Sequence, residues 1–241
     1  MKNFALILPI ALLWSLLHFG RQAPVDSNPL NKVLKKMDTA AAAFRTTQAE
    51  FEWDNYQKVI DEVDNVQTGT IYYRRTGNQI EMMADVKKEG SDLKSLKPAP
   101  KYVLFSQGKV RMYQPKPDQV TEVDLSKDRS VESYVVLGIG GSGQDLLKAF
   151  DVTYVGPDTV SGIATAKLQL VPKSEKVRNT YHRILLWIDL DKGISVQQQF
   201  FTPQEDYRLV KYSNIRVNEK ISEEVFKLKT TSKTQTISPH G

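Results

Sequence analysis

The stretch Gly69-Thr70-Ile71-Tyr72-Tyr73-Arg74-Arg75 decides the fold that we expect for this chain. It is rich in β-branched and aromatic residues, which favour a β-strand. Side chains alternate between the two faces of a strand, so Ile71, Tyr73 and Arg75 share one face and Arg74 lies on the other. If the first face points inward, Arg75 lies at the edge of an apolar interior and needs hydrogen-bond partners. If it points outward, Arg75 is an ordinary surface charge.

Apolar and polar residues alternate along much of the remaining chain, which predicts further strands. Short turns such as those at 76–78 and 191–193 join them, so neighbouring strands run antiparallel. The sequence therefore predicts a mainly β (α+β) protein, an unclosed antiparallel barrel or curved sheet of about ten strands with helices on one side. The predicted strands are 49–54, 66–75, 80–85, 102–105, 110–113, 119–125, 152–155, 164–171, 183–190, 194–202, 207–217 and 226–230.

Two helical segments accompany the strands. Asn28-Pro29 fits an N-cap followed by proline at the first helical position, and apolar residues at spacings of three and four continue to about residue 45. Ser142 and Asp145 resemble a capping box at the start of a short helix over 142–150. These helices either pack on the sheet in a filled core or cover an opening in it.

The N-terminal residues predict export. Lys2 and the apolar run over 4–19 fit a secretory signal peptide in residues 1–23, with an uncleaved anchor as the alternative, followed by one domain over 24–241. Without Lys2 and Arg21 the net charge falls from +5 to +3, too little to suggest nucleic-acid binding. The chain contains no cysteine, which excludes disulfides, thiol catalysis and an acylated N-terminal cysteine.

No group of residues indicates catalysis. Residues 138–143 fit G-x-G-x-x-G, but that fingerprint requires a parallel βαβ unit, so we interpret the segment as a flexible hinge. His182 has no second ligand at metal spacing, and the paired carboxylates lie in turns or at strand ends. We therefore expect a protein that is not an enzyme and holds neither a metal nor a cofactor.

Apolar side chains are in excess on one predicted face of the sheet. They line a concave cavity or, alternatively, belong to a filled core. The candidate cavity residues are Phe51, Trp53, Ile71, Tyr73, Ile80, Met82, Val103, Phe105, Val110, Met112, Leu168 and Leu170.

The order of several motifs resembles that of the LolA family, the periplasmic carriers of outer-membrane lipoproteins. The resemblance covers nearly all of the chain after its N-terminal segment. The motifs that follow the N-terminal helix are the segments 69–75, 107–115, 170–173, 188–189 and 218–221 with Phe226.

This resemblance implies an apolar cavity under a helical lid. It implies a monomer that takes acylated lipoproteins from an inner-membrane transporter and passes them to an outer-membrane acceptor. It also implies that Arg75 faces the cavity and holds the lid closed through hydrogen bonds. A sensor domain of the same fold and a structural β protein with a filled core remain as alternatives. The candidate lid residues, which fill the empty cavity and compete with cargo, are Val135, Val136, Leu137, Leu146 and Leu147.

Overall fold

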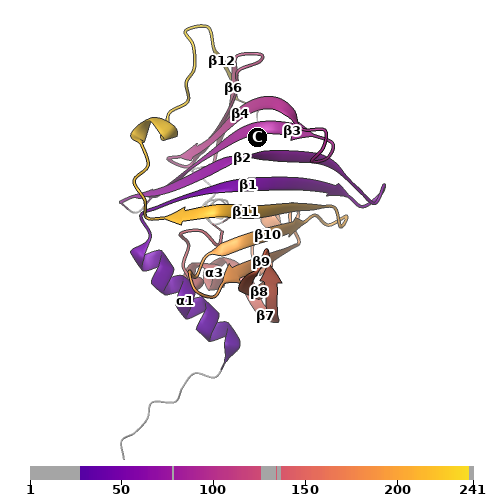
Figure 1. Ribbon diagram of the computed structural model, residues 1–241, viewed down its shortest axis with the longest axis vertical. Helices are drawn as coiled ribbons and strands as arrows, with labels where there is room; N and C mark the ends of the chain where they lie inside the picture. Colours follow the sequence, from indigo (N-terminus) through magenta and orange to yellow (C-terminus); the bar gives the residue numbers. More distant parts are fainter. Residues whose placement is uncertain (1–27, 78, 126–133, 135–136, 239–241) are drawn as a thin grey trace, which may run out of the picture.

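A single sheet of twelve strands organises the computed structural model, which describes residues 28–77, 79–125, 134 and 137–238. Along the sheet the strands are ordered β12-β6-β5-β4-β3-β2-β1-β11-β10-β9-β8-β7, so β12 and β7 lie at opposite ends (Figure 1). Neighbours are antiparallel except for β12 and β6, which are parallel. The sheet is curved and does not close, which confirms the predicted fold class.

The elements have the following bounds. The strands are β1 (Thr46–Gln57), β2 (Glu62–Thr76), β3 (Gln79–Gly90), β4 (Lys97–Ser106), β5 (Lys109–Gln114), β6 (Gln119–Asp124), β7 (Phe150–Val160), β8 (Ile163–Pro172), β9 (Arg183–Asp189), β10 (Ser195–Phe201), β11 (Tyr207–Val217) and β12 (Gln235–Ile237). The helices are α1 (Pro29–Ala43), α3 (Gly143–Ala149), α4 (Glu175–Arg178) and the 3-10 helix η1 (Glu223–Phe226).

The stretch 69–75 lies within β2, between β1 and β3. Ile71 and Tyr73 are buried and pack among apolar residues of β1, β3 and β11, so the face that they share with Arg75 points inward. We call this the inner face of the sheet. Glycine is required at position 69, because a Cβ atom there would lie 2.1 Å from the carbonyl oxygen of Asp85 on β3.

Both predicted helix starts are confirmed. The Asn28 side chain accepts a hydrogen bond from the Leu30 N–H, and Pro29 is the first residue of α1. Ser142 and Asp145 form a reciprocal capping box at α3. Both helices lie at the end of the sheet formed by β7 to β10 (Figure 1).

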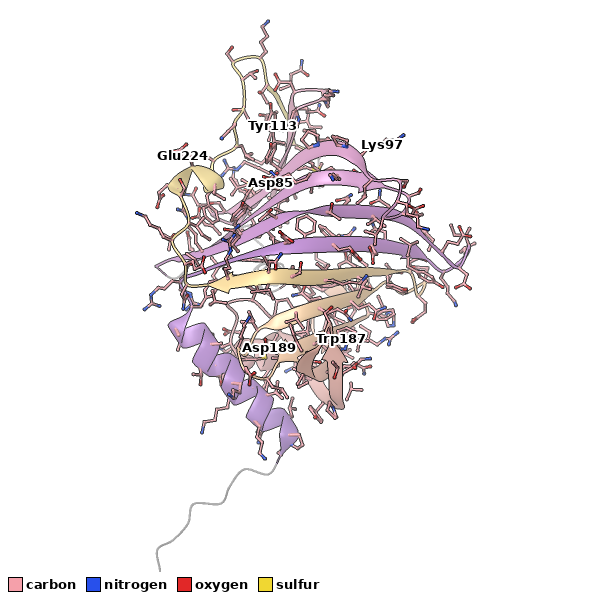
Figure 2. All side chains as sticks on the ribbon, in the orientation of Figure 1. Asp85, Lys97, Tyr113, Trp187, Asp189 and Glu224 are labelled. Carbon is pink, nitrogen blue, oxygen red and sulfur yellow. The ribbon has the colours of Figure 1, made fainter. Side chains whose placement is uncertain are left out.

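A turn predicted from its residues at 191–193 is also present. The buried carboxylate of Asp189 on β9 accepts hydrogen bonds from the backbone N–H groups of Asp191 (2.8 Å) and Lys192 (3.0 Å). These bonds fix the reversal of the chain between β9 and β10. Asp189, the last residue of β9, is labelled in Figure 2.

The predicted strand over 226–230 is wrong. Ser222 accepts a hydrogen bond from the Glu224 N–H and begins η1 instead, and Phe226 packs on Met83 and Leu104. Residues 221–228 therefore pack on the outer face of β3 and β4. Figure 2 labels Glu224 of η1. The Phe226 ring is buried, but none of the described strands pairs with the backbone of residues 226–230, so the segment is not a strand.

Candidate functional site

An apolar cavity of about 390 Å³ lies on the inner face. Its walls come mainly from β1, β2, β3, β10 and β11, with one residue each from β4 and β5, and no carboxylate is among the described residues that line it. The lining residues are Phe51, Trp53, Ile71, Tyr73, Met82, Ala84, Val103, Val110, Tyr134, Tyr181, Gln198, Phe200, Arg208, Val210 and Tyr212. We call the strands β1–β5, β10 and β11, with this cavity, the hollow half of the inner face.

Seven of the twelve residues predicted for a cavity line it: Phe51, Trp53, Ile71, Tyr73, Met82, Val103 and Val110. Ile80 packs beside this group, Met112 is paired with Val103, and Phe105 is almost fully buried opposite Met82. Leu168 and Leu170 lie elsewhere, in a packed core on β8.

That packed core defines the filled half of the inner face, formed by β7, β8 and β9. Helix α1 contributes Val33, Leu34 and Met37, which pack with buried leucines and isoleucines of β8 and β9. Of the predicted lid residues, Leu137 and Leu146 are buried in this core and Leu147 packs against it. Val135 and Val136 lie outside the described residues.

Arg75 joins the two halves of the inner face. Its guanidinium donates to the carbonyl oxygen of Ala41 at the end of α1 (3.1 Å) and to that of Gly140 (2.8 Å). The guanidinium carbon also lies 5.5 Å from the centre of the Phe44 ring. The partly buried charge thus has backbone acceptors on two segments that cover the sheet.

The turn over 137–140 is held by two further hydrogen bonds. The Leu137 carbonyl accepts from the Gln198 side chain (2.6 Å), and the Gly138 carbonyl accepts from the Ser195 N–H (2.7 Å). Gly138 has a φ of +70°, and a Cβ atom there would lie 2.5 Å from Cβ of Ser195. The glycine run therefore allows the turn to pack closely on the sheet. The G-x-G-x-x-G pattern did not predict this role.

A small polar network lies between this turn and the cavity. The Tyr212 hydroxyl donates to the Gln198 side chain (3.5 Å), and Tyr212 and Tyr73 also interact through their hydroxyl groups. Burial raises the pKa of both tyrosines, so both remain protonated and able to donate. The network links the wall of the hollow half to the turn that Arg75 also contacts.

Arg208 lines the cavity at the end that lies away from Arg75, and it was not among the cavity residues predicted from the sequence. Its guanidinium carbon is 4.6 Å from the centre of the Trp53 ring, and it donates to Asn55 (3.1 Å) and to the Tyr181 hydroxyl (3.4 Å). Alternation of Arg208, Val210 and Tyr212 along β11 was the signal that placed it on the inner face.

Arg74, on the outer face, also has side-chain partners. It forms ion pairs with Glu81 (2.5 Å) and Glu223 (2.9 Å), and its guanidinium carbon lies 4.2 Å from the centre of the Phe226 ring. It therefore attaches η1 to β2 and β3, whereas Arg75 contacts α1 and the turn over 137–140.

Two features are absent from the described part of the chain. Within it, no cluster of three or more histidine or acidic side chains is arranged to hold a metal ion. None of the helices in the same residues is long and apolar enough to cross a membrane.

No protein-family model and no curated protein matches the sequence, but solved structures match the fold. MucB is 12% identical over 83% of this chain and 62% of its own, with a TM-score of 0.50. An uncharacterised conserved protein from Thermus thermophilus is 9% identical over 88% of this chain and all of its own, with a TM-score of 0.53. A LolA superfamily protein from Nitrosomonas europaea is 10% identical over 83% of this chain and 97% of its own, with a TM-score of 0.39.

The chain thus spans about 62% of the length of the MucB chain that it matches. At identities this low, likeness to solved structures concerns the fold and not the activity. The chain shares its fold with MucB and with the Thermus thermophilus protein.

Proposed function

We propose that this protein is a periplasmic carrier that binds the acyl chains of lipoproteins and passes them toward the outer membrane. The observation that carries the proposal is the apolar cavity of about 390 Å³ beside a packed turn that Arg75 contacts. The acyl chain would lie against the aromatic and aliphatic walls of the hollow half. Donor and acceptor would be the inner-membrane transporter and the outer-membrane protein that the family resemblance implies.

The cavity volume favours a closed state that must open to take a whole lipid anchor. Sites that enclose one drug-sized ligand have volumes of roughly 300–1,000 Å³, so this cavity is near the lower end. Each buried methylene contributes about 0.8 kcal/mol, so three long chains would contribute roughly 30 kcal/mol, beyond the roughly 20 kcal/mol at which affinities saturate. Displacing Leu137, Leu146 and Leu147 from the filled half would offset part of this gain and make release possible.

We assign to Arg75 the role of latch. Its two hydrogen bonds hold the end of α1 and the turn over 137–140 against β2, and cargo that moves either segment must break one of them. A hydrogen bond to a charged group contributes about 1.5–3 kcal/mol, so reclosure of the latch would help to expel cargo. The same contact would therefore serve closure and release.

The test is titration of the purified protein with a fluorescent triacylated lipopeptide and with the same peptide lacking acyl chains. We expect saturable binding of the lipopeptide alone. Absence of saturable binding would favour a structural β protein with a filled core. The loaded protein is then mixed with outer-membrane vesicles, and binding without any release to them would favour the sensor alternative over the carrier.

A further inference from the structure

The end of the cavity at Arg208 differs from its apolar walls. β11 places Arg208 opposite Asn55 of β1, whereas the end of β2 at Arg74 is paired with Thr46. Nine residues of β1, or roughly 30 Å, therefore separate this end of the sheet from the latch. An acyl chain lying along the cavity would have one end beside Arg208.

No acidic side chain of the described residues compensates the charge of Arg208. Both of its hydrogen-bond partners, Asn55 and the Tyr181 hydroxyl, are neutral, and among the described residues no carboxylate oxygen lies within 4.0 Å of it. Lys211 on the same strand, in contrast, pairs with Glu52 at 2.6 Å. A guanidinium at the rim of an apolar cavity without a counter-ion is suited to binding an anion.

The acidic residues that precede Arg208 in the chain are already occupied. Glu205 pairs with Arg183 and His182, each at 3.0 Å. Asp206 accepts a hydrogen bond from the Lys58 N–H at 2.7 Å. Neither is therefore positioned to neutralise the guanidinium.

A second, independent observation is an unused donor in the same wall. The indole nitrogen of Trp53 is buried and has no hydrogen-bond acceptor among the described residues, although Trp53 lines the cavity and its ring lies under the Arg208 guanidinium. A buried donor without an acceptor is uncommon in folded proteins. Within the described part of the chain, the Arg208 guanidinium thus lacks a counter-ion and the Trp53 indole N–H lacks an acceptor.

We propose that Arg208 and Trp53 bind the anionic head of an amphiphile, a carboxylate or a phosphate, whose acyl chain occupies the cavity. This rests on the proposed function only in that the cavity takes an acyl chain. The guanidinium presents paired N–H donors that match two oxygens of either group. The ligand class is then an acyl chain with one anionic head, such as a fatty acid or a lysophospholipid.

The experiment compares ligands that share one acyl chain and differ in their head group. Palmitate, palmitoyl lysophosphatidate and uncharged methyl palmitate each displace a fluorescent naphthylamine probe from the purified protein, below their micellar concentrations. We expect at least one anionic ligand to bind on the order of tenfold to a hundredfold more tightly than the ester. Preference for palmitate over lysophosphatidate, or the reverse, identifies the carboxylate or the phosphate.

Variants then assign the preference to its residue. Arg208→Gln is expected to bring the anionic ligand to the affinity of the ester and leave the ester unchanged, and Arg208→Lys to keep part of the preference. Arg183→Gln is the matched control, because Arg183 also lies over an aromatic ring, Phe201, but has Glu205 as its partner. Its substitution should leave the preference intact.

The outcomes separate the two proposals. Equal affinity of acid, phosphate and ester in the wild type, or an equal loss of all three in Arg208→Gln, overturns the anion site and leaves the acyl cavity in place. If no ligand displaces the probe saturably, the cavity and the anion site both fail. Thermal unfolding of each variant ensures that a loss of preference is not a loss of folding.

Discussion

The two halves of the inner face are built from the same kind of strand but have different contents. In the filled half, α1, α3 and Leu137 cover β7, β8 and β9, and residues such as Ile184 and Leu168 have no exposed surface. In the hollow half, side chains of the same kind, among them Ile71 and Val103, face a cavity. What lies over a strand, and not its own alternation, decides whether its inward residues form a core or a binding wall.

The largest expected effect comes from truncating the same residue type in each half. Ile184→Ala removes a side chain that is packed on all sides and should lower the free energy of unfolding by about 2–5 kcal/mol. Ile71→Ala, at the cavity wall, should lower it by less, because Ile71 already lacks neighbours on one side. Urea unfolding measures both variants.

Ligand affinity should show the reverse order. Ile71→Ala is expected to weaken acyl binding, and Ile184→Ala to leave it nearly unchanged in protein that remains folded. If both substitutions reduced stability equally and neither changed affinity, the distinction between the halves would be wrong.

The next effect concerns the turn that joins the halves. Gly140 has a φ of +78°, and a Cβ atom there would lie 2.8 Å from the buried Phe44 ring. Gly140→Ala should therefore lower the free energy of unfolding by about 2–4 kcal/mol, from left-handed backbone strain and overpacking together. Thermal or urea unfolding measures it.

Gly77→Ala is its matched control. Gly77 has a φ of +61°, but nothing lies within 4 Å of the position that its Cβ would occupy. Its substitution should lower stability by about 1 kcal/mol, the strain contribution alone. Equal losses at the two positions would show that contact between the turn and Phe44 is unimportant.

The latch prediction has a smaller effect on stability and a larger one on transfer. Arg75→Leu leaves the carbonyls of Ala41 and Gly140 without this donor, and should lower the free energy of unfolding by about 1–3 kcal/mol. We expect the variant to bind lipopeptide but to release it to outer-membrane vesicles slowly or not at all. Release kinetics of the fluorescent lipopeptide measure this.

Arg74→Leu is the neighbouring control on the outer face. It should leave transfer nearly intact, although it removes the ion pairs to Glu81 and Glu223 and loosens η1. Wild-type release by Arg75→Leu, or an equal defect in both variants, would contradict the latch.

The sequence was sufficient to predict the faces of the strands but not what covers them. Alternation placed Ile71, Tyr73 and Arg75 inward, and the two helix caps were readable from Asn28 and Ser142. The same alternation assigned Leu168 to the cavity, yet α1 lies over it. Helix position over a sheet depends on long-range packing, which period-2 patterns do not encode.

Polar members of the cavity were harder to predict than apolar ones. Gln198 and Arg208 occupy inward positions of β10 and β11, where an apolar pattern predicts a hydrophobic side chain. Their partners, the Leu137 carbonyl and the Trp53 ring, are distant in sequence. The alternation within one strand carries no information about such distant partners, so it does not indicate a polar side chain at these positions.

The smallest expected effect is a dependence of stability on pH that arises on the outer face and not on the inner face. Burial raises the pKa of Glu81, but hydrogen bonds from Ser106 (2.6 Å) and Arg74 (2.5 Å) and the charge of Arg74 outweigh this, so the pKa lies below its ordinary value. A carboxylate with a lowered pKa stabilises the fold above its unfolded-state pKa, and this stabilisation disappears as the pH falls through the folded-state pKa.

Acid should therefore weaken the attachment of η1 without changing the binding of an uncharged ester, because no carboxylate is among the described residues that line the cavity. We expect wild type to lose up to about 1 kcal/mol more than Glu81→Gln between pH 7 and about pH 3, measured by urea unfolding. An equal acid loss in both proteins would show that Glu81 contributes nothing. If the affinity for methyl palmitate changed with acid, the two faces would be coupled, because Glu81 lies on the outer face and the ester binds on the inner face.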